Sequence, residues 1–292
     1  MRNKILRFLA VCLVITCTGF IVHLFWLSGL KGEETYPSDS FLKAVSNKTA
    51  LIITAHDDDA VAFSGTVRQL VEDGWKVHYM TFYGNWRPED NPVRKQEAAL
   101  FSDILGISET ELIDFDILKT DTVKEPWMPV QYKLFANYFR MDSLRRMIDD
   151  RVQRIKPSVI FTLDEVMGGY GHPQHVCVSK CIHQVCDTLK SHGDCPVQRI
   201  YQCVMPPSQN ERIVGDLPVF RAAKEVYETE GMPLPDVEIS ITDCAAEKMS
   251  VMRAFESQKR NLKKFWPSYN LYPSWVYFGI FDREYFHIVE LT

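Results

Sequence analysis

The sequence lacks an excess of positive charge. Its 33 lysines and arginines are outnumbered by 38 aspartates and glutamates, which leaves a formal net charge of −5. Nucleic-acid-binding domains usually present a basic face, so this balance argues against a nucleic-acid partner. Internal repeats and low-complexity tracts are missing as well, which argues against a repeat architecture. With 46% hydrophobic and 24% charged residues, the composition is that of a globular protein rather than a disordered one.

A glycine-rich dinucleotide-binding loop is also missing, because no Gly-x-Gly-x-x-Gly follows the first β-rich segment. What the chain does have is an alternation of β-rich segments with segments of helical periodicity. We expect strands at 49–55, 76–83, 110–115, 157–163 and 199–204, and helices at 60–71, 94–105, 141–155 and 245–264. This alternation predicts an α/β fold, with a mainly parallel sheet covered by helices on both faces.

The N-terminus contains a 23-residue run without charged side chains, from Phe8 to Leu30. A helix of this length is about 34 Å long, enough to cross the ~30 Å hydrocarbon core of a membrane. Basic residues precede the run at Arg2, Lys4 and Arg7, so the positive-inside rule places the N-terminus in the cytoplasm. The rest of the chain is then expected on the extracytoplasmic side.

A cleaved signal peptide is the alternative interpretation of this run. Its apolar core would usually be shorter, and no clear small-x-small cleavage site precedes Lys31. We therefore favour an uncleaved signal anchor or transmembrane helix at residues 1–30. A polar tether at 31–48 and one domain at 49–292 are expected to follow it.

The first predicted strand ends in a cluster of one histidine and three carboxylates, His56, Asp57, Asp58 and Asp59. Unpaired charges in a protein core cost several kcal/mol or more. At the carboxyl end of a strand they are well placed for chemistry, because α/β sheets bind ligands at that edge. A helix N-cap would explain one or two of the aspartates but hardly all four residues. The cluster is therefore a candidate site.

A second cluster, with His172 and His175, follows the predicted strand 157–163 and so lies at the same edge of the sheet. Catalytic zinc sites use three protein ligands of the imidazole and carboxylate type and leave one position for water. We expect His56, Asp59 and His175 to be these ligands, with Zn²⁺ as the metal and Fe²⁺ as a possible substitute. Asp58 then remains as a carboxylate beside the metal.

These groups suit the hydrolysis of an amide or an ester. Metal binding lowers the pKa of a bound water toward ~7, and a neighbouring carboxylate such as Asp58 can remove its proton. His172 could stabilise the oxyanion or protonate a leaving amine. Considered alone, His172 and His175 would be interpreted as ordinary surface histidines. They become candidate site residues because they are expected at the same edge of the sheet as His56.

The two clusters resemble the motifs of the PIG-L/LmbE-type de-N-acetylases, zinc-dependent enzymes that remove acyl groups from amino-sugar conjugates. The family's first motif reads Ala-His-Pro-Asp-Asp-Glu, and residues 55–60 read Ala-His-Asp-Asp-Asp-Ala. The second motif reads Gly-His-Pro-Asp-His, and residues 171–175 read Gly-His-Pro-Gln-His. Further matches place the resemblance over about residues 49 to 260.

The resemblance implies a Rossmann-like domain with His56, Asp59 and His175 as zinc ligands and Asp58 as general base. It further implies His172 as an electrostatic or acid catalyst, and on resemblance alone Tyr170 near the oxyanion and Arg94 toward the substrate. Three residues depart from the motifs, namely Asp57, Ala60 and Gln174. They are expected to loosen the turn, to remove a carboxylate near the ligands and to remove carboxylate tuning of His172.

The leading hypothesis is a membrane-anchored, metal-dependent hydrolase that removes an acetyl or other acyl group from an N-acyl amino-sugar conjugate. Its substrate would be a glycolipid, a glycan or a small conjugate. One alternative is a non-catalytic carbohydrate-binding or scaffold protein with a relic site, suggested by the three departures. Another is an amidase or esterase that acts on a non-sugar acyl compound.

Overall fold

The computed structural model describes residues 2–83, 89–119 and 125–291. Seven strands form one sheet in the order β3-β2-β1-β4-β5-β7-β6. The five strands expected from the sequence are present and pair in parallel, whereas β7 is antiparallel to both β5 and β6. The strands are β1 (Thr49–Thr54), β2 (Lys76–Tyr83), β3 (Glu109–Asp114), β4 (Val159–Leu163), β5 (Arg199–Val204), β6 (Val237–Ser240) and β7 (Arg283–Glu290).

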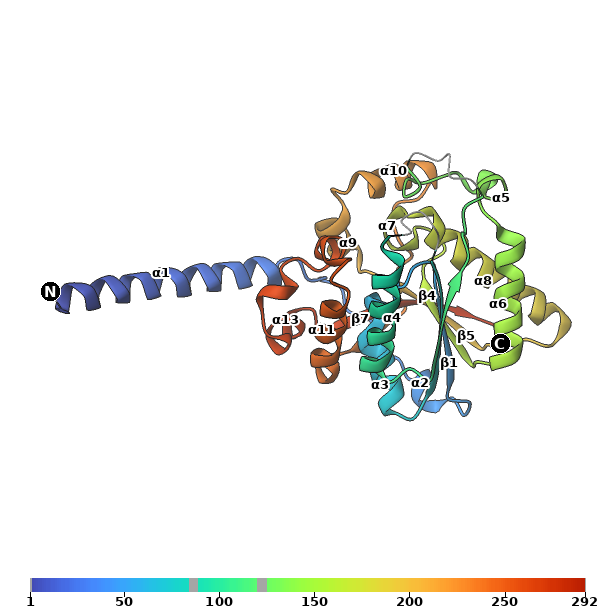
Figure 1. Cartoon of the computed structure of the whole chain (residues 1–292), viewed down its shortest axis with the longest axis horizontal. Coiled ribbons are helices and arrows are strands. Elements are labelled where there is room, and N and C mark those ends of the chain that lie inside the picture. Colours follow the sequence, from blue (N-terminus) through green and yellow to red (C-terminus); the bar gives the residue numbers. More distant parts are fainter. Residues whose placement is uncertain (1, 84–88, 120–124, 292) are drawn as a thin grey trace.

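Helices cover both faces of this sheet (Figure 1). The α-helices are α1 (Arg2–Ser28), α2 (Phe41–Ala44), α3 (Ser64–Glu72), α4 (Asn91–Leu105), α5 (Phe135–Tyr138), α6 (Met141–Ile155), α7 (Gly168–Gly171), α8 (Pro173–His192), α9 (Pro207–Val214), α10 (Pro218–Val226), α11 (Ala245–Ala254), α12 (Lys259–Phe265) and α13 (Ser274–Ile280). Short 3-10 helices are η1 (Asp59–Phe63), η2 (Tyr132–Leu134), η3 (Thr242–Cys244) and η4 (Tyr269–Leu271).

The alternation of side chains along β1 divides the core into two layers. Ala50 and Ile52 belong to a buried cluster that includes residues of α3, α4, α11 and α13. Leu51 and Ile53 belong to the cluster on the other face, which includes residues of α6, α8 and α10. Successive side chains of a strand point to opposite faces, so a strand that is apolar throughout needs helices on both sides. The predicted α/β class with a mainly parallel sheet is confirmed.

The C-terminal part differs from the expectation in two respects. The single helix expected near 245–264 is divided into α11 and α12, with residues 255–258 between them. The aromatic-rich tail contains β7, which inserts between β5 and β6 and completes the sheet. Phe286 on β7 is fully buried, and its ring lies against Phe161 and Tyr201 of the parallel strands.

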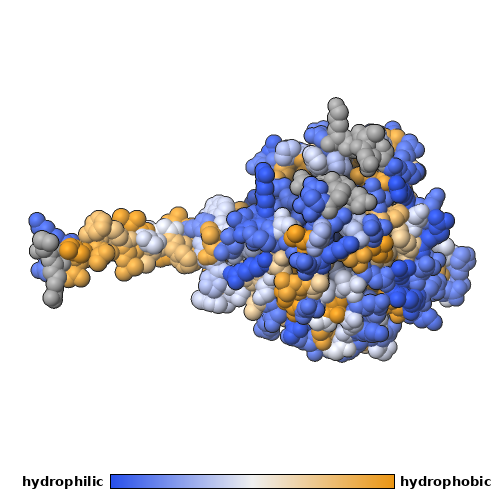
Figure 2. Space-filling model, in the orientation of Figure 1, coloured by the Kyte–Doolittle hydropathy of each residue, from blue (hydrophilic) through white to orange (hydrophobic). Residues whose placement is uncertain are grey.

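Helix α1 projects away from the domain as one long apolar rod (Figures 1 and 2). Its residues Asn3–Ser28 are long and apolar enough to cross a membrane, a criterion that a signal sequence also meets. Residues 31–48, expected as a polar tether, contact the domain. Glu34 bonds to Ser208, Lys31 pairs with Asp282 at 2.6 Å, and Ser38 forms a β-bridge with Glu238.

Candidate active site

The two polar clusters follow the adjacent central strands β1 and β4. From β1 the chain crosses over to β2 on one side, whereas β4 pairs with β1 on the other and continues to β5. The connections therefore diverge between β1 and β4, and such a switch point opens a crevice at the carboxyl ends of the strands. His56 comes two residues after β1, and His172 and His175 follow β4 by way of α7.

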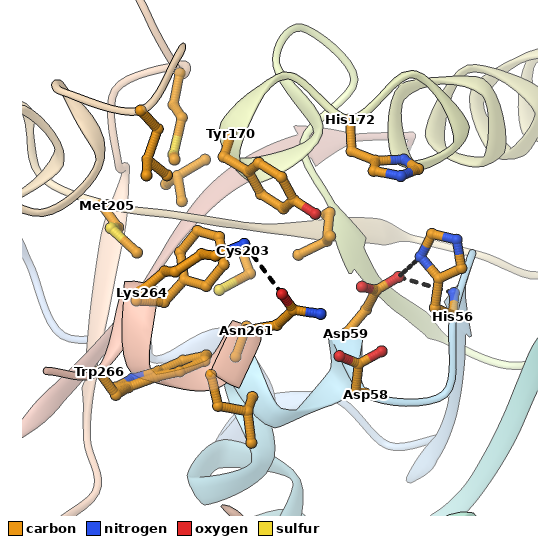
Figure 3. A pocket seen from close by; sticks show the side chains of 18 of the residues that line it. His56, Asp58, Asp59, Tyr170, His172, Cys203, Met205, Asn261, Lys264 and Trp266 are labelled. Carbon is orange, nitrogen blue, oxygen red and sulfur yellow. Dashed lines mark hydrogen bonds and ion pairs between the residues drawn. The ribbon is translucent and has the colours of Figure 1, made fainter. Parts of the chain in front are cut away.

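Hydrogen bonds fix the turn that follows β1. The Thr54 hydroxyl donates to the carbonyl oxygen of His56 at 2.7 Å, and the Tyr79 hydroxyl donates to that of Asp57 at 3.0 Å. The backbone N–H of His56 donates to Oδ2 of Asp59 at 2.8 Å. The imidazole and this carboxylate therefore face the same point, as Figure 3 shows. The loosening expected from Asp57 in place of proline stays a prediction.

The loop after β4 is held by the buried carboxylate of Asp164, which sequence reasoning missed. Asp164 accepts hydrogen bonds from the backbone N–H groups of Val166 and Gly169 at 3.0 and 2.7 Å. Burial raises the pKa of this carboxyl, although the backbone donors oppose the shift. Gly168 has φ +57°, and a Cβ there would lie 2.6 Å from Cβ of His175. A glycine is therefore required where this loop passes the histidine.

Three acceptor atoms converge between the two clusters. Nδ1 of His56 lies 3.0 Å from Nε2 of His175, and the Asp59 carboxylate lies 3.5 and 3.2 Å from these two atoms. The other nitrogen of each ring already has a partner. Nδ1 of His175 donates to the carbonyl oxygen of Gly168 at 2.8 Å, and Nε2 of His56 donates to Oε1 of Gln174 at 3.2 Å. In the neutral tautomers, lone pairs therefore point at one another and at a carboxylate.

This donor set fits a divalent metal ion. Bonds of 2.0–2.2 Å in a tetrahedral site hold neighbouring ligand atoms about 3.3–3.6 Å apart, close to the separations seen here. Metal-ligating histidines usually donate their second ring N–H to a carbonyl, a carboxylate or a water, and both rings do so. His56, His172 and His175 also form a group whose ligand atoms lie within 4.8 Å of one another. The ligand atoms of His56, His175 and Asp59 lie closer to one another than those of the three histidines, and Asp59 adds a negative charge.

The charges around this point reinforce one another. Burial disfavours a charged His56, yet the Asp59 and Asp58 carboxylates together outweigh burial and raise the pKa of that imidazole. For Asp59, burial would raise the pKa, but His175 and His56 hold it well below its usual range. The site thus keeps a carboxylate ionised and attracts positive charge, as a cation site requires.

Arg94 on α4 is occupied by two of the three aspartates. Its Nε donates to Oδ2 of Asp57 at 3.2 Å, and its Nη2 donates to Oδ1 of Asp57 and, at 2.8 Å, to Oδ1 of Asp58. Asp57 is buried, and burial, partly offset by Arg94, raises its pKa to about 6. The extra charge of Asp57 is therefore paired with Arg94. Nη1 takes part in none of these bonds.

His172 and Tyr170 line the same cavity as His56, Asp59 and Arg94. Nδ1 of His172 accepts from the backbone N–H of Gln174 at 3.3 Å, so the proton of the neutral ring is on Nε2. Burial and the neighbouring His175 and His56 hold the pKa of His172 well below its usual range. Burial also raises the pKa of Tyr170, whose hydroxyl points toward the same space in Figure 3. Both side chains are therefore neutral hydrogen-bond donors.

The sequence of this region matches a known family. Residues 51–186 match the family model described as PIG-L: GlcNAc-PI de-N-acetylase. The predicted resemblance to the PIG-L family is confirmed. Among curated proteins, the chain is 25% identical over 228 residues to the 1D-myo-inositol 2-acetamido-2-deoxy-alpha-D-glucopyranoside deacetylase of Rhodococcus jostii (strain RHA1). That alignment covers 66% of this chain and 75% of the relative.

Solved structures share the fold at low sequence identity. The 4-carboxy-2-hydroxymuconate hydratase GalB of Pseudomonas putida KT2440 superposes with a TM-score of 0.53 at 17% identity, over 83% of this chain and 96% of that chain. The N,N'-diacetylchitobiose deacetylase of Pyrococcus horikoshii gives 0.51 at 16% identity, over 86% of each chain. Since these two proteins have different names and activities, the likeness supports the fold alone.

The PIG-L match contains every candidate residue, and the structure brings all of them together. These residues are His56, Asp58, Asp59, Arg94, Tyr170, His172 and His175. Of the three departures from the family motifs, Asp57 pairs with Arg94 and Gln174 bonds to His56. Ala60 is fully buried in the apolar core. The partnership of Gln174 with His56 was not expected from the sequence.

A cavity of about 560 Å³ adjoins the PIG-L motif residues. His56, Asp58, Asp59 and His172 line one end of it, and Trp127 on the long loop before η2 lines it as well. The remaining wall is largely apolar and comes mostly from the C-terminal part of the chain, including Phe265, Trp266, Phe278 and Phe281. The reactive groups thus lie at the polar end of a space larger than an acetyl group needs (Figure 3).

Proposed function

We propose that this protein is a metal-dependent N-deacetylase that removes the acyl group of an N-acyl amino-sugar conjugate. The observation that carries this proposal is the convergence of Nδ1 of His56, Nε2 of His175 and the Asp59 carboxylate beside Asp58, a carboxylate outside that set. The relative from Rhodococcus jostii, named as a deacetylase of an acetamido-glucopyranoside, supports the reaction class and the sugar substrate.

His56, Asp59 and His175 would hold a Zn²⁺ or Fe²⁺ ion. When bound, the ion would supply a water of lowered pKa and a Lewis acid for the acyl oxygen. In the proposed reaction, Asp58 accepts the proton of the attacking water. Arg94 engages Oδ1 of Asp58, which leaves Oδ2 to receive that proton. The proton then passes to the leaving nitrogen, the C–N bond breaks, and a carboxylate and an amine are formed.

Two neutral donors complete the proposed mechanism. His172 has its proton on Nε2 because Nδ1 accepts from the Gln174 N–H. This Nε2–H and the Tyr170 hydroxyl would donate to the developing oxyanion, which is how preorganised donors lower a barrier. The depressed pKa of His172 favours this donor role over that of a charged acid. Arg94 would position Asp58 and offer Nη1 to the substrate.

We further propose that α1 remains attached as a membrane anchor. The last turns of α1 are packed as part of the fold. Leu27 is fully buried, Leu24 and, just after the helix, Leu30 pack against the core cluster, and the ring of His23 stacks on that of Tyr272. Removal of this helix would expose the apolar surface that it covers. The positive-inside rule places the domain outside the cytoplasm, where a glycolipid or glycan substrate would be accessible.

Elemental analysis of the detergent-solubilised full-length protein tests the metal site, with His175→Ala as the ligand variant. The control is His192→Ala, which alters an exposed histidine at the other end of α8. We expect about one Zn²⁺ or Fe²⁺ per chain in the wild type and the control, and loss of that metal in His175→Ala. Acetate release should then be measured on N-acetylglucosamine conjugates, with the acyl length and the sugar varied separately. Absence of metal after zinc reconstitution would overturn the proposal.

A further inference from the structure

The segment that follows α12 lies against the C-terminal third of the membrane-span candidate, and not only against its last turn. Tyr272 contacts two residues of α1, with ring centroids 5.2 Å from Phe20 and 5.6 Å from His23. Nε2 of His23 also lies 3.3 Å from the Ser268 hydroxyl. Phe20 and His23 are eight and five residues before Ser28, the last residue of α1. At about 1.5 Å per residue they lie roughly 12 and 8 Å inside the end of the helix.

The basic N-terminal end of α1 limits how the helix can sit in a bilayer. If the hydrocarbon core begins just after Arg7, its ~30 Å takes about 20 residues and extends to the region of Leu27. Tyr272 would then lie at or below the boundary between hydrocarbon and headgroups. A shift of α1 that places His23 at the boundary leaves only about 24 Å of helix between Arg7 and His23. In both placements, the residues around Tyr272 are at the membrane surface or below it.

The side chains on either side of Tyr272 have the character of a membrane-interface segment. Leu271 is 65% exposed and Trp275 is 75% exposed, the highest value among the exposed large hydrophobic side chains that the described part of the domain presents. Tryptophan is enriched where proteins meet the headgroup region. The preceding helix α12 also contributes the exposed cations Arg260 and Lys263. Such cations suit the anionic headgroups of a bilayer.

We infer that Tyr269–Ile280, covering η4 and α13, is a second membrane-contact surface, with Leu271 and Trp275 inserted at the lipid interface beside α1. This inference rests on the proposal that α1 spans a membrane. A lipid bilayer is the occupant that the geometry favours, because the surface is continuous with the membrane-span candidate. Two attachments, the helix and this surface, would fix the orientation of the domain on the membrane, which a single flexible tether would not do.

The test is photo-crosslinking of the full-length protein in nanodiscs of phosphatidylcholine and phosphatidylglycerol. A benzophenone amino acid is placed singly at position 271, 275, 13 or 100, and lipid adducts are measured by mass spectrometry. Leu13 lies within α1 and is the positive control, whereas Leu100 is an exposed apolar residue of α4 and is the negative control. The substituted side chains are all exposed, and an unchanged melting temperature verifies folding of each variant.

We expect lipid adducts at positions 271 and 275 at several times the yield at position 100. Adducts at position 13 together with background yields at 271 and 275 would overturn the second contact and leave the anchor intact. Background yields at all four positions would show that α1 itself is outside the bilayer, and would overturn both. Neither readout depends on catalysis, so failure of the proposed deacetylase activity is distinguished from failure of this inference.

Discussion

At the scale of single residues, the orientation of two imidazole rings decides what the site can bind. The carbonyl oxygen of Gly168 can only accept a hydrogen bond, so Nδ1 of His175 must donate to it and Nε2 is left as an acceptor. Gln174 does the same for His56 through its Oε1. Because these partners fix the tautomers before any ion arrives, the ligand atoms are preorganised.

The first prediction concerns this role of Gln174. Gln174→Ala removes the acceptor for Nε2–H of His56 and should weaken metal binding by about 10–100-fold, the usual effect of losing such a partner. Competition with a chelator measures the affinity. Gln184→Ala is the matched control, since Gln184 is an exposed residue of the same helix that bonds to Arg145. Equal affinities of the two variants would contradict the role assigned to Gln174.

The second prediction concerns Asp58. Asp58→Asn keeps the shape of the side chain but removes the proton acceptor, so kcat should fall by about 10²–10⁴-fold, the usual contribution of a general base. Metal content should be unchanged because Asp58 lies outside the proposed ligand set. Asp150→Asn on the exposed surface of α6 is the control. Wild-type turnover in Asp58→Asn would exclude the proposed base.

The motif positions of the site could be predicted from the sequence because strand ends bring distant residues to one edge. His56 and His175 are 119 residues apart, yet each follows one of two adjacent parallel strands. The partners of Arg94 could not be predicted in this way. Its position opposite Asp57 and Asp58 depends on how α4 packs over the sheet, which the local pattern does not encode.

At the scale of elements, a buried ion pair joins α3, α11 and β7. Glu284 on β7 accepts from the backbone N–H groups of Gly65 and Thr66 at 2.9 and 2.7 Å, at the N-terminus of α3. It also pairs with Lys248 of α11, whose Nζ donates to the carbonyl oxygen of Val61 at 3.1 Å. Backbone donors and a cation together satisfy a carboxylate that is almost fully buried.

The third prediction tests this junction. Glu284→Gln leaves the Lys248 ammonium buried without its counter-charge and should lower the free energy of unfolding by about 3–5 kcal/mol. Adding Lys248→Met to that variant removes the stranded charge and should restore part of the loss. Urea unfolding in detergent measures both variants, with the half-exposed Glu290→Gln as the control. A loss no larger than that of the control would show that the pair contributes little.

The strands that the sequence failed to predict, β6 and β7, both lie in the last third of the chain. In the antiparallel pairing of β7 with β5, Phe286 lies opposite Cys203. These two residues are more than 80 positions apart in the sequence. The β7 segment lacks a clear alternation of apolar and polar residues. Which of its side chains are buried is decided by packing against distant parts of the chain, and the local sequence does not show this. The parallel strands were easier to predict, since each is a short apolar run followed by a helical pattern.

At the scale of the whole molecule, the helix and the domain form a continuous structure. Residues 31–48 follow the domain surface through contacts with Asp282, Ser208 and Glu238. The division into an anchor at 1–30, a tether at 31–48 and a domain at 49–292 stays a prediction. The basis for this division is the exposure of α1. The domain covers only part of this apolar helix, and most of its side chains are exposed (Figure 2).

The fourth prediction distinguishes a retained anchor from a cleaved signal. Since Leu27 is fully buried and Leu24 packs against the core, the mature protein should keep α1. Intact-mass spectrometry of protein extracted from membranes should then give the full-length chain, and a carbonate wash should leave it in the membrane fraction. A mature chain beginning near residue 30 would contradict the packing argument. Leu27→Asp should not release the helix from the bilayer, but it should lower the melting temperature, because it places a charge where α1 meets the domain.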